Sequence, residues 1–262
     1  MNYSQAGLQT RYSQTRKSSM FTWVRLISNL QVEKISVRYG DVRVLWDVSF
    51  KVEEGQIVSL IGSNGSGKTT VLKTISGLLR PSSGRIIFGD KVLSSAPIEK
   101  IVEIGVVYTP EGRGIFPDMT VAENLAMGSY TKRARSHQKE TLHKVYSLFP
   151  ILEKRNKQLA GTLSGGEAQM LAIGRGMMSM PKLLMLDEPS AGISPIVADA
   201  IFGAIANLKE QGLTILVVEQ DAGRALKLSD SSYVLENGNV TLEGKGTEML
   251  KNEYVKKAYL GM

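Results

Sequence analysis

A glycine-rich segment constrains the fold of this chain more than any other feature. The mostly apolar run Gln56–Ile61 predicts a short buried strand of the kind found in parallel sheets. The letters GSNGSGKT follow at once, from Gly62 to Thr69, and a helix is expected from Gly67 to about Ser76. A loop of this composition between a strand and a helix predicts a site whose backbone N–H groups bind phosphate.

The residue types in this loop fit nucleotide binding better than a plain glycine turn. Glycines let the backbone approach phosphate oxygens, and the start of the following helix adds its positive end. Lys68 supplies a positive charge for the β- and γ-phosphates, and the hydroxyl of Thr69 is suited to ligate Mg²⁺. The residues expected to hold ATP here are Gly62, Ser63, Asn64, Gly65, Ser66, Gly67, Lys68, Thr69 and Thr70.

Two acidic residues end a second predicted strand. A run of apolar residues leads to Asp187 and Glu188, and Pro189 then breaks the strand. Open α/β sheets bind ligands at the carboxyl ends of their strands. We therefore expect Asp187 to hold Mg²⁺, directly or through water, and Glu188 to polarise the water that attacks the phosphate. Without the phosphate-binding loop, a polar turn after a strand would explain these acids equally well.

A third motif, LSGGE, spans Leu163–Glu167 and lies about one helix length before Asp187. Ser164 and the glutamate three residues later have the spacing of a capping box, so a well-capped helix explains part of the motif. A cap does not need two glycines, however. Gly165 and Gly166 expose backbone N–H groups at a helix start, which predicts an anion site.

The rest of the chain alternates strands with helices, which predicts one doubly wound α/β core. A capping box at Thr120–Glu123 opens a mainly helical stretch, residues 117–162, in which Lys132–Lys144 is expected to form an exposed helix face. The pair Asn237-Gly238 lies between two β-rich runs and predicts a hairpin. Further strands are expected at Leu30–Val37, Val42–Val52, Arg85–Phe88, Lys182–Asp187 and Leu213–Glu219.

Composition limits the classes of function. No run approaches the roughly 18 apolar residues of a membrane-spanning helix, so a membrane role would require a partner. The net charge is +7, and +4 of it comes from residues 1–29, which contain four basic residues and no acid. The remaining charge fits a solvated surface, and no nucleic-acid partner is expected. Residues 1–29 are expected to be a disordered extension; a transit peptide and a true start nearer Met20 are the alternatives.

The three motifs, in this order, resemble those of the ATP-binding-cassette (ABC) family over about residues 30–262. Within that family the chain most resembles an ATP-binding subunit of branched-chain amino acid importers, through residues 108–116, 170–175, 218–220 and 233–238. The resemblance implies an α/β fold, a P-loop NTPase cassette with an N-terminal antiparallel β subdomain. A helical subdomain, at about residues 117–165, would be inserted before the LSGGE signature.

The resemblance also implies roles for single residues. Tyr39 would stack on adenine, although a tyrosine at a strand end needs no such role. Ser164, Gly165 and Gly166 would complete the ATP site of a facing subunit. Residues 190–193 would touch that partner, and the 110–120 region, with Phe116, would receive a helix of a membrane subunit; an ordinary loop is the alternative for the latter.

Two positions depart from the wider family but match the importer subgroup. Glu111 stands where most cassettes have a glutamine that contacts Mg²⁺ and the attacking water. Gln220 stands where most have a histidine that contacts the γ-phosphate. Gln220 can donate a hydrogen bond but cannot carry a positive charge, and Glu111 adds a negative charge near phosphates. We count both, with Glu188, as candidate catalytic residues.

The function implied by the resemblance is that of an ATP-hydrolysing motor subunit of an importer for branched-chain or other neutral amino acids. ATP and Mg²⁺ would be its ligands. Its partners would be two membrane-spanning permease subunits, a second homologous ATPase in a heterodimer and, indirectly, an extracytoplasmic solute-binding protein. It would lie peripherally on the cytoplasmic face of the inner (plasma) membrane. The alternatives are a motor for urea or another small polar solute, or a non-transport cassette in translation or DNA repair.

Overall fold

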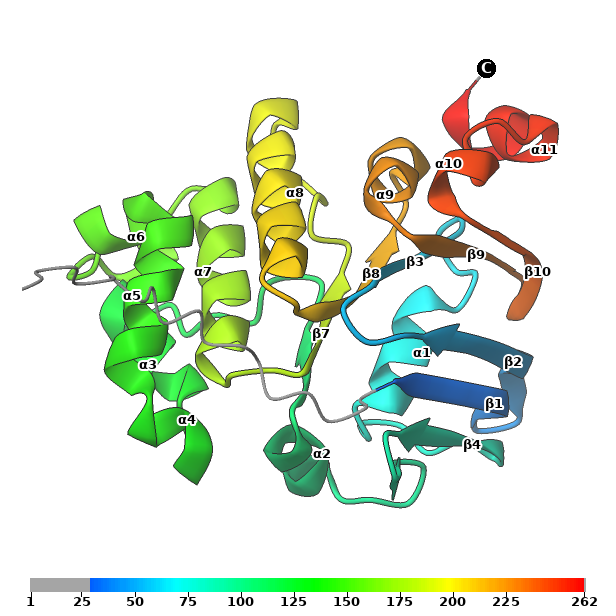
Figure 1. Cartoon of the computed structure of the whole chain (residues 1–262), viewed down its shortest axis with the longest axis horizontal. Helices are drawn as coiled ribbons and strands as arrows, with labels where there is room; N and C mark the ends of the chain where they lie inside the picture. The colour runs from blue at the N-terminus through cyan, green and yellow to red at the C-terminus, as the bar shows by residue number, and fades with distance from the viewer. Residues whose placement is uncertain (1–28, 262) are drawn as a thin grey trace, which may run out of the picture.

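A computed structural model describes residues 29–261, and its centre is a six-stranded sheet in the order β10-β9-β3-β8-β7-β6 (Figure 1). Five of these strands run parallel, and β10 joins the edge antiparallel to β9. The expectations for residues 1–28 lie outside the described part of the chain. The strands are β3 (Ile57–Ile61), β6 (Val106–Thr109), β7 (Leu183–Asp187), β8 (Thr214–Glu219), β9 (Ser231–Glu236) and β10 (Asn239–Gly244).

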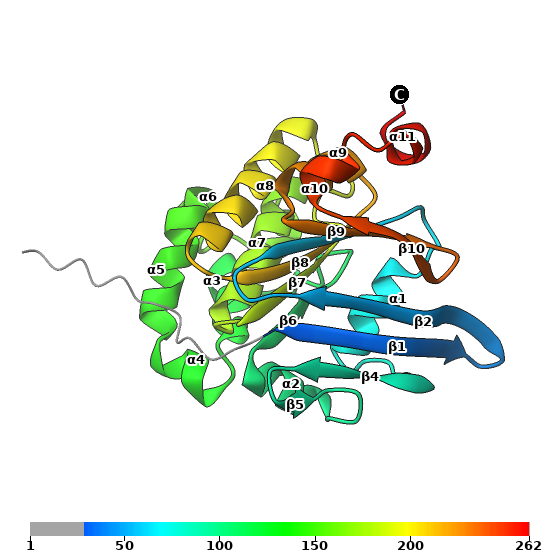
Figure 2. The same ribbon diagram turned by 45° about the vertical axis from the view of Figure 1, so that its right-hand side comes forward.

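Both faces of the central strands are buried, which explains their continuous apolar sequence. In β7, Leu183 and Met185 pack into the cluster shared with α1 (Lys68–Ile75). The alternate residues, Leu184 and Leu186, pack into the cluster on the opposite face. That face is covered by α7 (Gly165–Met178) and α8 (Pro195–Glu210) (Figure 2). The doubly wound core predicted from the sequence is confirmed.

A second, antiparallel sheet has the order β2-β1-β4-β5 and lies beside α1 (Figures 1 and 2). Its strands predicted from the sequence are present, with β1 two residues longer than expected. The pairing of β1 shifts register near Lys34, which has a φ of 46°. The strands are β1 (Leu30–Tyr39), β2 (Val42–Val52), β4 (Ser83–Phe88) and β5 (Lys91–Val92).

The helical stretch differs from expectation at its basic segment. Lys132–Lys144 does not form one continuous exposed helix face. The segment is divided between two helices, because the helix is interrupted at His137, where φ is −114°. The hydroxyl of Ser136 donates to the carbonyl of Arg133, and Thr141 is buried. The helices are α3 (Val121–Gly128), α4 (Lys132–Ser136), α5 (Gln138–Leu148), α6 (Pro150–Lys154) and the short 3₁₀ helix η1 (Ala160–Thr162).

The remaining elements complete the two ends of the sheet. The expected hairpin joins β9 to β10, and both Asn237 and Gly238 have positive φ, as its tight turn requires. Within residues 29–261, no helix combines the length and apolar character needed to cross a membrane. The other helices are α2 (Ile98–Ile104), α9 (Ala222–Leu228), α10 (Gly246–Met249), α11 (Glu253–Val255) and the π-helical turn η2 (Lys256–Leu260).

Candidate nucleotide-binding site

The phosphate-binding loop connects β3 to α1, as its sequence predicts. The ammonium of Lys68 is buried and donates to the carbonyl oxygens of Gly62 (2.9 Å) and Ser63 (3.1 Å). Gly67 has a φ of 107°, and a Cβ there would lie 2.6 Å from a methyl carbon of Leu45. Only glycine can occupy this position, where the loop turns into the helix.

Two observations show that the loop fits an anionic ligand. The hydroxyl of Ser66 is buried and has no hydrogen-bond partner among the described residues. No side chain caps the first turn of α1, so its N-terminal end is available to phosphate. The pocket in front of the loop has a volume of about 390 Å³. It is lined by Val44, Asn64, Gly65, Gly67, Lys68, Thr69, Thr70, Glu111 and Glu188.

Asp187 lies at the end of β7 and is 1% exposed. The Thr69 hydroxyl donates to one carboxylate oxygen (3.1 Å), and the Tyr108 hydroxyl donates to the other (2.8 Å). Burial raises the pKa of Asp187, and it also raises the pKa of Tyr108, with a further contribution from Asp187. The paired oxygens of Thr69 and Asp187 are the donors that Mg²⁺ prefers. The contact from Tyr108 was not expected from the sequence.

Glu188 adopts a backbone conformation that is rare for residues other than glycine, with a φ of 47°. Its N–H donates to the carbonyl oxygen of Val218 (2.8 Å), which fixes the residue against β8. Its carboxylate lies 3.3 Å from the ammonium of Lys68. The two motifs, separated by more than a hundred residues in the sequence, therefore meet in one pocket. Such strain is common where a catalytic side chain must be aimed.

Only some of the other candidate residues line this pocket. Glu111 is exposed and lines it. Gln220 is also exposed but lines a neighbouring pocket of about 370 Å³, which it shares with Glu188. Tyr39 is 46% exposed at the end of β1 and does not line either pocket, so its role in adenine binding stays a prediction. Val44, in contrast, lines the loop pocket and was not expected.

The signature motif opens α7 with the predicted capping box. The Ser164 hydroxyl accepts from the N–H of Glu167 (3.4 Å), and the Glu167 carboxylate accepts from the N–H of Ser164 (2.9 Å). A Cβ on Gly166 would lie 2.4 Å from a methyl carbon of Val197, so close packing on α8 requires that glycine. Ser164, Gly165 and Gly166 line neither of the two pockets that Glu188 lines.

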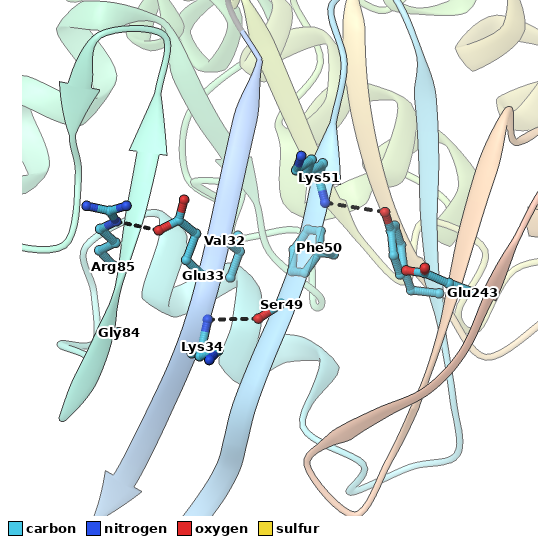
Figure 3. Close-up of a pocket in the computed structure, with 10 residues that line it drawn as sticks. Val32, Glu33, Lys34, Ser49, Phe50, Lys51, Gly84, Arg85 and Glu243 are labelled. Carbon is cyan, nitrogen blue, oxygen red and sulfur yellow. Dashed lines mark hydrogen bonds and ion pairs between the residues drawn. The ribbon is translucent and has the colours of Figure 1, made fainter.

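A larger open pocket lies away from the motifs. It has a volume of about 770 Å³ and is bordered by the antiparallel sheet and the β9–β10 hairpin (Figure 3). Its charged rim is partly satisfied within the chain, since Glu33 pairs with Arg85. The Tyr233 hydroxyl accepts from the N–H of Lys51 at 3.4 Å. No residue of the predicted site lines this pocket, so its size does not make it the functional site.

Comparison with known proteins agrees with this geometry. A family profile described as ABC transporter matches residues 45–191, more than half of the chain. The chain belongs to the ABC transporter family. As an ABC ATPase, it binds ATP and hydrolyses it. The resemblance noted in the sequence and the cassette fold expected from it are both confirmed.

Relatives of this ABC ATPase are known in bacteria and archaea. The high-affinity branched-chain amino acid transport ATP-binding protein BraG of Pseudomonas aeruginosa is 47% identical over 88% of this chain and 99% of BraG. BraF of the same organism, which carries the same description, is 34% identical over 88% of this chain and 97% of BraF. The crystal structure of the ADP conformation of an ABC transporter cassette has a TM-score of 0.77 and 30% identity, and covers 90% of this chain and 100% of that one.

Proposed function

We propose that this ABC ATPase is the motor subunit of an importer for branched-chain amino acids. The observation that carries the proposal is its 47% identity, over nearly the whole length, to a protein described as serving branched-chain amino acid transport. The site supports a motor because one pocket holds a phosphate-binding loop, a lysine and a candidate base. Its partners would hold this chain at the cytoplasmic face of the membrane, where ATP is available.

The chemistry proposed for the site assigns each side chain one task. Lys68 and the loop N–H groups hold the β- and γ-phosphates. Thr69 and Asp187 hold Mg²⁺, which neutralises phosphate charge when bound. Glu188 polarises the attacking water. The carboxylate of Glu188 lies 3.3 Å from the Lys68 ammonium, so binding of a phosphate to Lys68 would free the carboxylate to accept a hydrogen bond from water.

The proposed partners follow from two surfaces. A pocket of about 350 Å³ lies beside Phe116, Met127 and Tyr130, each of which is between 42% and 50% exposed. The guanidinium of Arg175 lies 5.1 Å from the ring centre of Phe116, at the floor of this pocket. Exposed apolar side chains around a hollow suit a helix of a permease subunit. Two such permeases, and indirectly a solute-binding protein, would complete the transporter.

The second proposed partner is another ATPase of the same family. In a head-to-tail dimer, the exposed Ser164 and its neighbouring glycines would complete the site of the facing chain. BraF and BraG are two distinct ATP-binding proteins of one organism with the same described role, which supports a heterodimer here. The proposed partners include no nucleic acid.

Co-purification tests the assignment to a transporter. The full chain, tagged and extracted from membranes with a mild detergent, should retain two permease subunits and a second cassette. A matched variant, Phe116→Asp, places a charge on the apolar rim and should lose the permeases while retaining ATP binding, because the phosphate-binding loop is untouched. Recovery of ribosomes or DNA in place of membrane proteins would contradict the proposal.

A further inference from the structure

Glu219 is an acidic residue in the centre of the parallel sheet. It ends β8, which lies between β3 and β7, and it is 1% exposed. The other residues of β8 are mostly aliphatic and pack into the two cores. A carboxylate at such a position is costly to bury unless backbone donors satisfy it. Core packing alone does not explain this residue.

Three backbone N–H groups satisfy the carboxylate of Glu219. One oxygen accepts from Ser190 (2.9 Å), and the other accepts from Gln220 (3.2 Å) and Asp221 (3.4 Å). Arg224, the cation that lines the same pocket, pairs instead with Asp199 and Asp221. Glu219 therefore acts on backbone and not as half of an ion pair with Arg224.

The three donors belong to two separate loops. Ser190 lies in the loop between β7 and α8, which also contains Glu188, whereas Gln220 and Asp221 form the short connection between β8 and α9. Glu188 and Gln220 line one pocket of about 370 Å³, and Glu219 lines the same pocket. One buried carboxylate thus ties together the two loops from which the candidate base and Gln220 project.

We propose that Glu219 is a positioning residue for ATP hydrolysis, which holds these two loops at a fixed spacing so that Glu188 and Gln220 face the γ-phosphate together. The proposal rests on the roles proposed above for Glu188 and Gln220. In this proposal Glu219 acts only through the backbone of Ser190, Gln220 and Asp221.

The test changes the side chain of Glu219 in two ways. In Glu219→Gln an NH₂ group must face at least one of the three N–H donors, so one link between the loops is lost. In the full chain, assembled with its partner subunits, of which the second ATPase is made unable to hydrolyse, ATP turnover should fall by about tenfold or more. ATP affinity, measured by calorimetry, should change by less than about twofold, because the phosphate-binding loop is intact. Glu219→Asp keeps the charge but shortens the side chain, and its turnover should lie between those of the unmodified chain and Glu219→Gln.

A matched control is Asp230→Asn. Asp230 also accepts a backbone N–H, that of Ile57 (2.8 Å), but at the opposite end of the sheet. The ATP turnover of the Asp230→Asn variant should equal that of the unmodified chain, even if the melting temperature of the variant is lower. The double variant of Glu219→Gln with Gln220→Ala should lose less turnover than the product of the two single losses, because both changes act in part through Gln220.

The outcomes separate the possible failures. Normal turnover in a folded Glu219→Gln variant overturns the proposal. If Glu219→Gln does not fold, the Glu219→Asp variant serves as the test, and normal ATP turnover in that variant also overturns the proposal. Losses that multiply in the double variant, or a Gln220→Ala variant with normal turnover at this chain's own site, show that Glu219 does not act through Gln220 and also overturn it. Absence of hydrolysis by the unmodified complex would instead contradict the ATPase function.

Discussion

The contact between Lys68 and Glu188 is the residue-level feature on which the chemistry depends. Removing the charge of Glu188 in Glu188→Gln leaves the phosphate-binding loop intact, but the attacking water loses the carboxylate that polarises it. We expect ATP affinity to be kept and turnover at this chain's own site, measured in a complex whose second ATPase cannot hydrolyse, to fall by about 100-fold or more. The measurement is phosphate release together with ATP binding. Near-normal turnover would contradict the role given to Glu188.

Sequence motifs located this site only in part, for a physical reason. Lys68, Thr69, Asp187 and Glu188 could be predicted because phosphate and Mg²⁺ demand fixed residue types at fixed spacing within a short segment. The contact of Tyr108 with Asp187 joins residues 79 positions apart, which no local pattern records. Similarly, Glu219 was predicted only as the end of a strand and as part of a resemblance, because its hydrogen-bond partner Ser190 is 29 positions away.

At the scale of elements, the C-terminal segment is attached to the β9–β10 hairpin through Glu236. The Tyr259 hydroxyl donates to its carboxylate (2.6 Å), and Tyr254 donates to the same oxygen. These two hydrogen bonds lower the pKa of Glu236, so the stabilisation is present above the ordinary glutamate pKa and is lost as the pH falls below it.

Tyr259→Phe removes one of these bonds without removing the ring. We expect the free energy of unfolding near neutral pH to fall by about 1 kcal/mol, or roughly 2–4 °C in melting temperature. The difference should shrink in acid. Tyr130→Phe, at an exposed tyrosine of the helical region, serves as the control and should leave the melting temperature unchanged. An equal loss in acid would argue that the ring packing, not the carboxylate, holds the segment.

Elements with strong local signals were predicted, and those set by tertiary context were not. The capping boxes at Ser164 and Thr120 and the Asn237-Gly238 turn all hold, because each depends on contacts within three residues. The strand β6 was missed because four residues are too few for periodicity, and its pairing with β7 decides its state. The break at His137 was missed for a similar reason, since side chains of Ser136 and its neighbour compete for helix carbonyls.

At the scale of the whole molecule, the proposed heterodimer predicts unequal ATP sites. Glu111 and Gln220 belong to the site of this chain, whereas Ser164 completes the site of the partner. We expect Ser164→Ala to damage the faster site and to reduce transport more than Gln220→Ala, which affects only the slower site. ATP turnover and solute uptake in the reconstituted complex measure both. If Gln220→Ala abolishes transport while Ser164→Ala is tolerated, the asymmetry runs the other way, and a fully active homodimer would contradict it altogether.

Uptake of labelled leucine tests the central claim most directly. The complete transporter is reconstituted into vesicles with ATP on the side that carries this chain, and accumulation is compared between the unmodified chain and Glu188→Gln. The account predicts ATP-dependent accumulation of leucine that the variant reduces, although its complex still assembles and binds ATP. Undiminished uptake with Glu188→Gln, or accumulation of labelled urea in place of leucine, would contradict it.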